Sequence, residues 1–407
     1  MTISQKDRAI LRELAKQQVE LAASERNQEL TRLWTTTGGK NQERPMIRIE
    51  LGTFEHEYLP ELMQCEGDIA RSMERQMRMP MINFTQFEDD ELVPDYFGVS
   101  VGYSFTPFDL PVKRQETGGV GHHFIPYLTD LEEDEHLLGK STWTIHADEA
   151  EARVRLAEDT FGDILPVKRM SNAAYCTPMQ DIVHIMNMDD MYMAMYDDEE
   201  RYIRMMDRLC DDYLELFREM EAKGYLFSAA RGQHLCQGTY CFTDELPDSK
   251  PNARLTDCWL YMDAQEAAGI SPTMYEELVF PSYKRVMDHF GLLSYGCCEA
   301  THPFWDSCLK DQSNLRKVSI SPWCDEKFMG EVLCGTNITY LRKPPATILG
   351  MDTPELDEDA ARACFRATAE AAKGCKCEII QRDVYQTGGN PEKVRKYVRI
   401  AREELGM

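Results

Sequence analysis

The C-terminal part of the chain alternates short apolar runs with longer amphipathic stretches. Strand-then-helix units in succession predict parallel strands joined by right-handed crossovers. The pattern fits a (β/α)8 TIM barrel or a doubly wound sheet, and because no G-x-G-x-x-G or Walker loop follows any run, a nucleotide-binding sheet has no support. Four units are predicted: 292–295 with 303–309, 317–321 with 325–333, 337–341 with 355–372, and 377–380 with 391–405.

The N-terminal half has a different pattern. Apolar residues recur at helical spacing over 5–33 and predict one or two amphipathic helices. We therefore expect an N-terminal helical extension over residues 1–45, followed by a barrel over 46–407. Further strands are predicted at 46–51, 81–85, 97–105 and 164–168, and long helices at 149–161 and 178–223.

Charge and cysteine content narrow the function classes. The 407 residues include 45 Lys and Arg against 70 Asp and Glu, a net charge of −25. Such an acidic chain without a basic cluster excludes a nucleic-acid-binding surface and attraction to an anionic membrane. The first twenty residues lack the apolar core of a signal peptide, so we expect a cytoplasmic protein whose 14 cysteines are reduced thiols.

Polar residues follow each of the four predicted strands. Parallel strands of a barrel deliver such residues to one rim, where barrel enzymes have their active sites. Two cationic loops at this rim would hold an anionic group or balance acidic site residues. The same residues also have structural interpretations, as turn cysteines, helix caps or an ion pair. They are Cys297, Cys298 and Glu299; Trp323, Cys324 and Asp325; Arg342 and Lys343; and Arg382 and Asp383.

Several groups have spacing compatible with metal ligands. Cys297, Cys298 and Glu299 form the best local group, with Cys324 expected on the next loop. Cys298 and His302 could instead form a thiolate–histidine pair. No G-x-S-x-G motif supports a serine nucleophile. Weaker candidates are His122-His123, His234-x-Cys236 and Cys375-x-Cys377.

Five segments together carry a resemblance to a known family. The chain resembles the uroporphyrinogen decarboxylase superfamily, in its methyltransferase-like branch from anaerobic bacteria, over about residues 175–405. The resemblance implies a (β/α)8 TIM barrel. It also implies an activity drawn from cofactor-independent porphyrinogen decarboxylation or zinc-dependent methyl transfer to or from a corrinoid protein. The segments are 257–281, 290–299, 315–325, 342–344 and 382–383.

Two departures from the family pattern separate these activities. The decarboxylases bind carboxylates through Arg-Gln-x-Gly-Arg, whereas this chain has Arg75-Gln76-Met77-Arg78 without the glycine. The thiol-methylating enzymes carry His-x-Cys after one strand and a cysteine after the last. Here Tyr295 takes the histidine position, Cys297 takes the cysteine position, and Asp383 and Tyr385 follow the last strand.

We therefore expect a methyltransferase of the O-demethylase type. It would move a methyl group from a small O- or N-methyl substrate to a corrinoid protein, with zinc as the Lewis acid. The alternatives are a metal-independent decarboxylase or lyase using Asp383 or Glu299, and a barrel that binds a tetrapyrrole or corrinoid without turnover. The expected roles are: catalytic, Glu299, Asp383 and Tyr295; substrate-binding, Arg342, Lys343, Arg382 and Trp323; zinc, Cys297, Cys298 and Glu299. Residues 1–145 would cap the barrel or build a homodimer interface.

Overall fold

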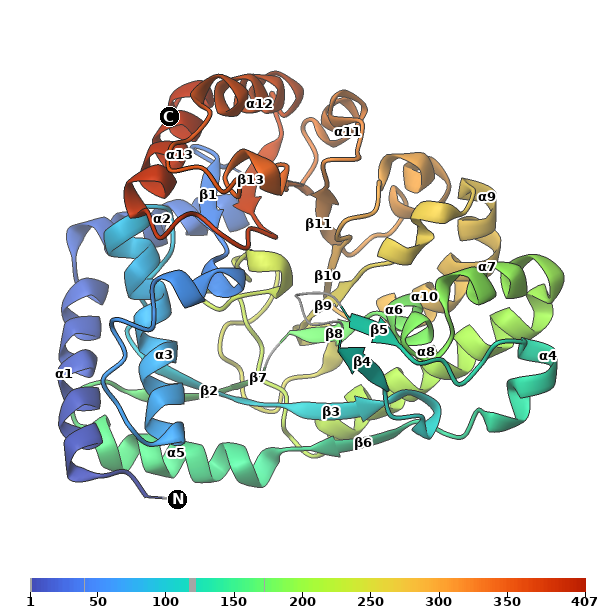
Figure 1. Ribbon diagram of the computed structural model, residues 1–407, viewed down its shortest axis with the longest axis horizontal. Helices are drawn as coiled ribbons and strands as arrows, with labels where there is room; N and C mark the ends of the chain where they lie inside the picture. Colours follow the sequence, from blue (N-terminus) through green and yellow to red (C-terminus); the bar gives the residue numbers. More distant parts are fainter. Residues whose placement is uncertain (1, 40, 117–121, 172) are drawn as a thin grey trace.

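A seven-stranded parallel sheet forms the centre of the computed structural model, which describes residues 2–39, 41–116, 122–171 and 173–407 (Figure 1). Every neighbouring pair of strands in it is parallel. The strands predicted at 46–51, 292–295, 317–321, 337–341 and 377–380 are confirmed. In spatial order the strands are β1 (Met46–Ile49), β13 (Lys376–Gln381), β12 (Thr339–Arg342), β11 (Leu315–Ile320), β10 (Leu292–Tyr295), β9 (Trp259–Met262) and β8 (Ala174–Cys176).

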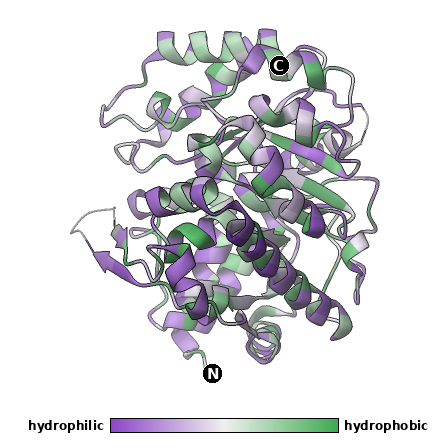
Figure 2. Ribbon diagram, turned by 90° about the vertical axis from the view of Figure 1, so that its right-hand side faces the viewer, coloured by the Kyte–Doolittle hydropathy of each residue, from purple (hydrophilic) through white to green (hydrophobic). Residues whose placement is uncertain are grey.

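Both faces of the sheet are buried. All residues of β9, β10, β12 and β13 are buried, as expected when helices cover the outside of a parallel sheet and side chains fill the inside. In Figure 2 the outward surfaces of the helices are mainly hydrophilic. The main covering helices are α8 (Glu199–Ala222), α10 (Phe280–Met287), α11 (Glu326–Leu333), α12 (Glu358–Ala371) and α13 (Pro391–Glu404).

The sheet is TIM-barrel-like, but its hydrogen-bonded strands do not close. Within the described residues β1 and β8 are edge strands and do not pair with each other. The free edge of β1 is occupied by side chains instead: the amide of Ile47 donates to Asp90 Oδ2 and that of Ile49 to Asp89 Oδ2, both at 2.8 Å. The expectation of a complete eight-stranded barrel is therefore met only in part, because carboxylates replace a strand at this edge.

A second layer lies beside the sheet, at the left of Figure 1. Here β2 (Phe97–Val101) pairs with β7 (Val167–Ser171), and α1 (Gln5–Ala22), α3 (Asp68–Ile82) and α5 (Ala147–Phe161) pack around them through a separate apolar cluster. The predicted N-terminal helices are confirmed as α1 and α2 (Glu25–Gly38). Ser24 caps the second of them by accepting from Asn27 N.

The strand predicted at 81–85 is wrong. These residues lie at the end of α3 and in a following π-helical turn, Asn83–Phe87. Met81, Ile82, Phe84 and Phe87 are buried from this helical backbone, so helical packing accounts for the apolar run.

The remaining elements are short or lie outside the central sheet. No helix in the described ranges has both the length and the apolar character needed to cross a bilayer. These elements are α4 (Leu131–Asp134), α6 (Pro178–Ile185), α7 (Met188–Asp197), α9 (Pro272–Met274), the antiparallel pair β3 (Tyr103–Thr106) and β6 (Thr142–Ile145), and the pair β4 (Arg114–Glu116) and β5 (His122–Phe124).

Asp90→Ala should strongly destabilise the fold. The Asp90 carboxylate is fully buried and accepts from the Ile47 amide (2.8 Å), from Arg44 (2.8 and 3.0 Å) and from Arg402 (2.8 Å). Its removal leaves a buried amide and two partly exposed cations without their partner and costs about 3 kcal/mol. Urea unfolding at neutral pH measures this. Asp211→Ala, which removes a surface ion pair with Arg285, is the control and should cost a small fraction of that. Equal costs would contradict the role assigned to the sheet edge.

The Asp90 carboxylate also makes the free energy of unfolding depend on pH. Burial alone would raise the pKa of Asp90, but Arg44 and Arg402 lower it below its ordinary value of 3.8. Its contribution is therefore present above the pKa of an unfolded aspartate and is lost as the pH falls through the lowered folded pKa. The stability difference between wild type and Asp90→Ala should shrink on acidification in urea titrations below about pH 4.

Candidate functional site

The loops that follow β9 to β13 bring polar side chains together at the carboxyl edge of the sheet. We call Gln237, Asp263, Cys297, Cys298, Glu299, Lys343 and Arg382 the rim cluster. Asp263, Lys343 and Arg382 each directly follow the last residue of their strand. Side chains alternate between the two faces of a strand, and these three positions face inward, toward the other members of the cluster. Carboxyl edges of parallel strands are where ligands bind in such folds.

Gln237 lies at the centre of the cluster. It belongs to the irregular segment between α8 and β9 and has a left-handed backbone with φ +63°. Its Oε1 accepts from Lys343 Nζ (2.8 Å) and from Arg382 Nη1, and Cys297 Sγ lies 3.3 Å away. Sequence analysis missed this residue, and an isolated glutamine in an irregular loop gave no signal for it.

Lys343 and Arg382 are brought together as expected. Lys343 is buried, and burial lowers the pKa of its ammonium group. Within the described residues it makes no ion pair, and its other contacts are the carbonyl oxygens of Gly296 (3.3 Å) and Cys297 (3.4 Å). Arg382 is partly paired, because its Nε donates to Glu50 at 2.6 Å. The two cations thus share one neutral acceptor, the Gln237 amide.

Arg342 and Tyr295 lie away from the rim cluster. Alternation turns Arg342 outward, where Nη2 pairs with Glu326 Oε1 at 2.5 Å between the sheet and its covering helices. Tyr295 is fully buried, and its hydroxyl meets that of Tyr275. The structure therefore places both side chains in helix–sheet packing, apart from the other predicted site residues.

Glu299 supports the loops through its carboxylate. Oε1 accepts from Ala264 N (3.0 Å) and Oε2 from Cys297 N (2.8 Å), so the buried side chain joins the loop after β9 to the loop after β10. Both of its oxygens are thus engaged by backbone amides.

The proposed zinc ligands are not arranged as a three-ligand site. Cys297 and Cys298 have their sulfurs 3.6 Å apart, while Cys324 Sγ accepts from Thr301 N at 3.3 Å. Across the described ranges, no group of three His, Cys, Asp or Glu side chains is placed to hold a metal ion. Two thiols alone do not fit a structural or catalytic zinc site, so we derive no step through a metal.

The two adjacent thiols, Cys297 and Cys298, differ in their pKa and in their exposure to solvent. The hydrogen bond from Cys297 lowers the pKa of Cys298 and raises that of Cys297. Cys298 is exposed, and so are Asp383, Tyr385 and Trp323, the last 75% exposed. Solvent therefore reaches the cluster from the side of Cys298.

Asp263 is a member that sequence analysis missed. It directly follows β9, and Tyr261 donates to its Oδ2 at 2.6 Å, whereas its buried Oδ1 has no partner among the described residues. Burial, and then the nearby Glu299, raises the pKa of Asp263 well above its ordinary value, which favours the protonated form of the carboxyl. The apolar run 259–262 could have indicated it, because a buried strand there places the next residue, Asp263, at the carboxyl edge of the sheet.

Of the weaker sequence candidates, Cys236 directly precedes Gln237 and lies close to the cluster: burial, and then Asp263, raises the pKa of its thiol to about 12, and Arg382 opposes that shift. The other candidates do not join the cluster. His302 Nδ1 accepts from Asp325 N at 3.2 Å. His234 contacts Glu91, and Cys375 donates to the Gly330 carbonyl at 3.3 Å. The glycine-rich segment before His122-His123 lies outside the described residues.

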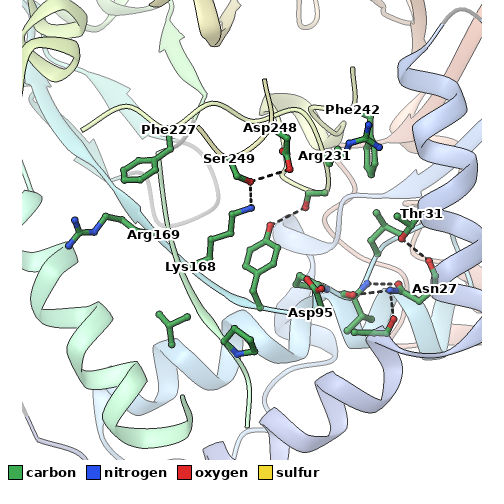
Figure 3. A pocket seen from close by; sticks show the side chains of 18 of the residues that line it. Asn27, Thr31, Asp95, Lys168, Arg169, Phe227, Arg231, Phe242, Asp248 and Ser249 are labelled. Carbon is green, nitrogen blue, oxygen red and sulfur yellow. Dashed lines mark hydrogen bonds between the residues drawn. The ribbon is translucent and has the colours of Figure 1, made fainter. Parts of the chain in front are cut away.

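A pocket of about 910 Å³ lies elsewhere (Figure 3). It is bounded by α2, by β7 and by the segment 227–251. Lys168 crosses it and donates to Ser249 Oγ at 2.6 Å, and Ser249 in turn donates to Asp248 at 3.2 Å. None of the rim cluster lines this pocket.

No family model matches the chain, and no curated protein matches it. Among solved structures, the chain is similar to a methyltransferase from Methanosarcina mazei, with 11% identity and a TM-score of 0.51 over 91% of this chain and 98% of that one. A putative vitamin-B12-independent methionine synthase from Listeria monocytogenes aligns over 64% of this chain and 70% of its own, with 14% identity, but its TM-score of 0.32 carries no argument. The comparisons thus establish a fold shared with a methyltransferase.

Proposed function

We propose that the protein is a methyltransferase that moves a methyl group from an oxygen or nitrogen of a small substrate to a corrinoid protein. The observation that carries the proposal is the buried carboxyl of Asp263 at the carboxyl edge of the sheet, whose Oδ1 has no partner among the described residues. The fold shared with a methyltransferase along most of the chain supports it.

Asp263 has the chemistry that removal of a methyl group from a heteroatom needs. The heteroatom gains negative charge as its bond to the methyl carbon breaks, so it must be protonated or coordinated. Asp263 donates its proton to that heteroatom, and the substrate leaves as the free alcohol or amine. A corrinoid on the partner protein, when bound, supplies the nucleophile that takes the methyl group.

The cations of the rim cluster orient the substrate. An anionic group on the substrate would replace Gln237 Oε1 between Lys343 and Arg382, because an ionised oxygen accepts from two cations more strongly than an amide does. Trp323, exposed just after β11, offers a flat apolar surface to the rest of the molecule.

The same groups could also serve a carboxy-lyase. In that reaction Lys343 and Arg382 hold substrate carboxylates, and Asp263 protonates the carbon that has lost carbon dioxide. The two functions differ in their products, and one set of assays separates them.

Asp263→Asn should lower kcat by about 10²- to 10⁴-fold with little change in KM, because it removes a proton donor and keeps the shape. The assay follows methylation of cob(I)alamin spectroscopically with a panel of methoxylated aromatic acids and methylamines. The wild-type rate should fall as the pH rises through the raised pKa of Asp263, since the acid form is the active one.

Asp306→Asn, on the exposed π-helical turn after β10, is the matched control and should leave the rate unchanged. Absence of methyl transfer from every member of the panel, with release of carbon dioxide from a carboxylated substrate, would replace the methyltransferase by the lyase.

The resemblance implies zinc, whereas the arrangement of the thiols and of Glu299 does not favour it, and metal analysis decides between the two. Because both oxygens of Glu299 are engaged by backbone amides, we expect purified protein to hold far less than one zinc per chain and to keep its activity in a chelator. A full equivalent of zinc that is lost in Cys297→Ser would instead show that the rim cluster rearranges around a metal.

A further inference from the structure

Two cations without an ion-pair partner line the pocket of about 910 Å³ between α2, β7 and the segment 227–251 (Figure 3). They are Lys168 and Arg231, and within the described ranges neither lies at ion-pair distance from a carboxylate. A third cation of the wall, Arg169, pairs with Glu151. In a chain with 70 acidic side chains against 45 basic ones, two unpaired cations at one pocket indicate a place for an anion.

Lys168 is held in position in this pocket. Its Nζ donates to Ser249 Oγ at 2.6 Å and lies 4.8 Å from the centre of the Tyr96 ring. An ammonium group has three N–H donors, so the bond to Ser249 leaves two of them without an acceptor among the described residues. Ser249 has a left-handed backbone with φ +53°, which is a strained conformation for a residue other than glycine. The cation is therefore fixed and still has hydrogen bonds to donate.

A chain of hydrogen bonds ties the backbone before Arg231 to the same end of the pocket. The amide of Ala230 donates to Asp248 Oδ1 at 3.2 Å. Asp248 Oδ2 accepts from Ser249 Oγ at 3.2 Å, and that hydroxyl is the partner of Lys168. Arg231 therefore extends from a backbone position that is bonded to the surroundings of Lys168.

A second contact ties the backbone after Arg231 to the same place. The Tyr96 hydroxyl donates to the carbonyl of Gly232 at 3.4 Å, and the Tyr96 ring faces the ammonium group of Lys168. The side chain of Arg231 is exposed and makes no hydrogen bond within the described part of the chain. Because this side chain is long and unpaired, both cations can reach one anionic group, Lys168 from a fixed position and Arg231 with five donors.

Two carboxylates on the wall limit the charge of that group. Asp95 and Asp248 also line the pocket. Asp248 is bonded through both oxygens, to Ala230 N and Ser249 Oγ, whereas Asp95 is exposed. Because two acids stand beside the two unpaired cations, a singly charged ligand is accommodated better than a doubly charged one such as a phosphate monoester.

The rest of the wall suits a flat apolar body. The pocket has the volume of ordinary small-molecule sites, in which apolar side chains surround a few polar groups. Two of its apolar residues, Phe227 and Phe242, are aromatic, and aromatic pairs contribute more than the area they bury. The apolar residues include Leu92, Pro94, Val167, Phe227, Phe242 and Pro251.

We propose that this pocket binds a small monocarboxylate with an aromatic body. The carboxylate accepts hydrogen bonds from Lys168 and Arg231, and the ring packs against the apolar side chains. The inference goes beyond methyl transfer, because no member of the rim cluster lines this pocket.

Phenylacetate and two compounds that each lack one of its features test the proposal on the full chain. Phenylacetamide keeps the ring without the charge, and acetate keeps the charge without the ring. Calorimetry and ligand-observed NMR at low ionic strength should give phenylacetate a dissociation constant in the millimolar range or tighter, and each of the other two at least about tenfold weaker binding. Equal binding of phenylacetate and either analogue, or no binding of phenylacetate, would overturn the proposal.

Two variants locate the binding. Lys168→Met removes the ammonium group but keeps an unbranched side chain, and Arg231→Gln removes an exposed cation. Each should weaken phenylacetate about fivefold or more, whereas Lys16→Met, at an exposed lysine of α1 outside the pocket, should not. A carboxylate held by Lys343 and Arg382 of the rim cluster would be insensitive to both pocket variants, so unchanged affinity in either of them would refute the assignment. Because Arg231 is exposed, its variant decides the question even where Lys168→Met does not fold.

Discussion

The acidic run Asp89-Asp90-Glu91 is the constraint on which the rest of the structure depends. A parallel sheet that stops at β1 exposes backbone amides, and here the carboxylates of Asp89 and Asp90 accept from them. Three buried acids are costly to desolvate, and the arrangement holds because cations from other elements neutralise them: Arg44 and Arg402 at Asp90, and Arg48 at Glu91. Asp89 has no such ion pair among the described residues, and burial, followed by Glu91, raises its pKa to about 6.

This edge also sets the positions of the functional groups. Arg48 and Glu50 occupy alternate positions, in β1 and just after it, and so share its inner face. Arg48 donates to the Gly238 carbonyl, and Glu50 holds Arg382 at 2.6 Å. One short strand therefore fixes both the irregular segment that carries Gln237 and the cation that Gln237 contacts. A shift of β1 by one residue would turn both side chains to the opposite face.

The sequence predicted those parts of the fold that local pattern determines. Runs such as 292–295 and 377–380 are strands whose residues are all buried. A short, nearly continuous apolar run of this kind predicts a buried parallel strand without any knowledge of the tertiary structure. The open edge could not be read, because it depends on side chains of an acidic run that resembles a solvated loop. The adjacent cations Arg342 and Lys343 could not be distinguished from the sequence for a similar reason. Neighbouring residues of a strand point to opposite faces, so only one of the two can enter the rim cluster. Which one does so depends on the register and the end of β12.

The irregular segment 233–241 carries polar side chains into three different surroundings. Lys317, earlier in β11 than the rim, donates through Nζ to Glu378 (2.5 Å) and to Thr239 Oγ1 (2.7 Å). These three buried side chains form an electrically neutral, hydrogen-bonded group below the rim cluster. Thr239 thus belongs to this group, Gln237 belongs to the rim cluster, and His234 lines a pocket beside α1. A regular strand could direct side chains only to two faces. Because this segment is irregular and is bonded to Arg48, Lys317 and Lys343, it contributes side chains to three surroundings within six residues.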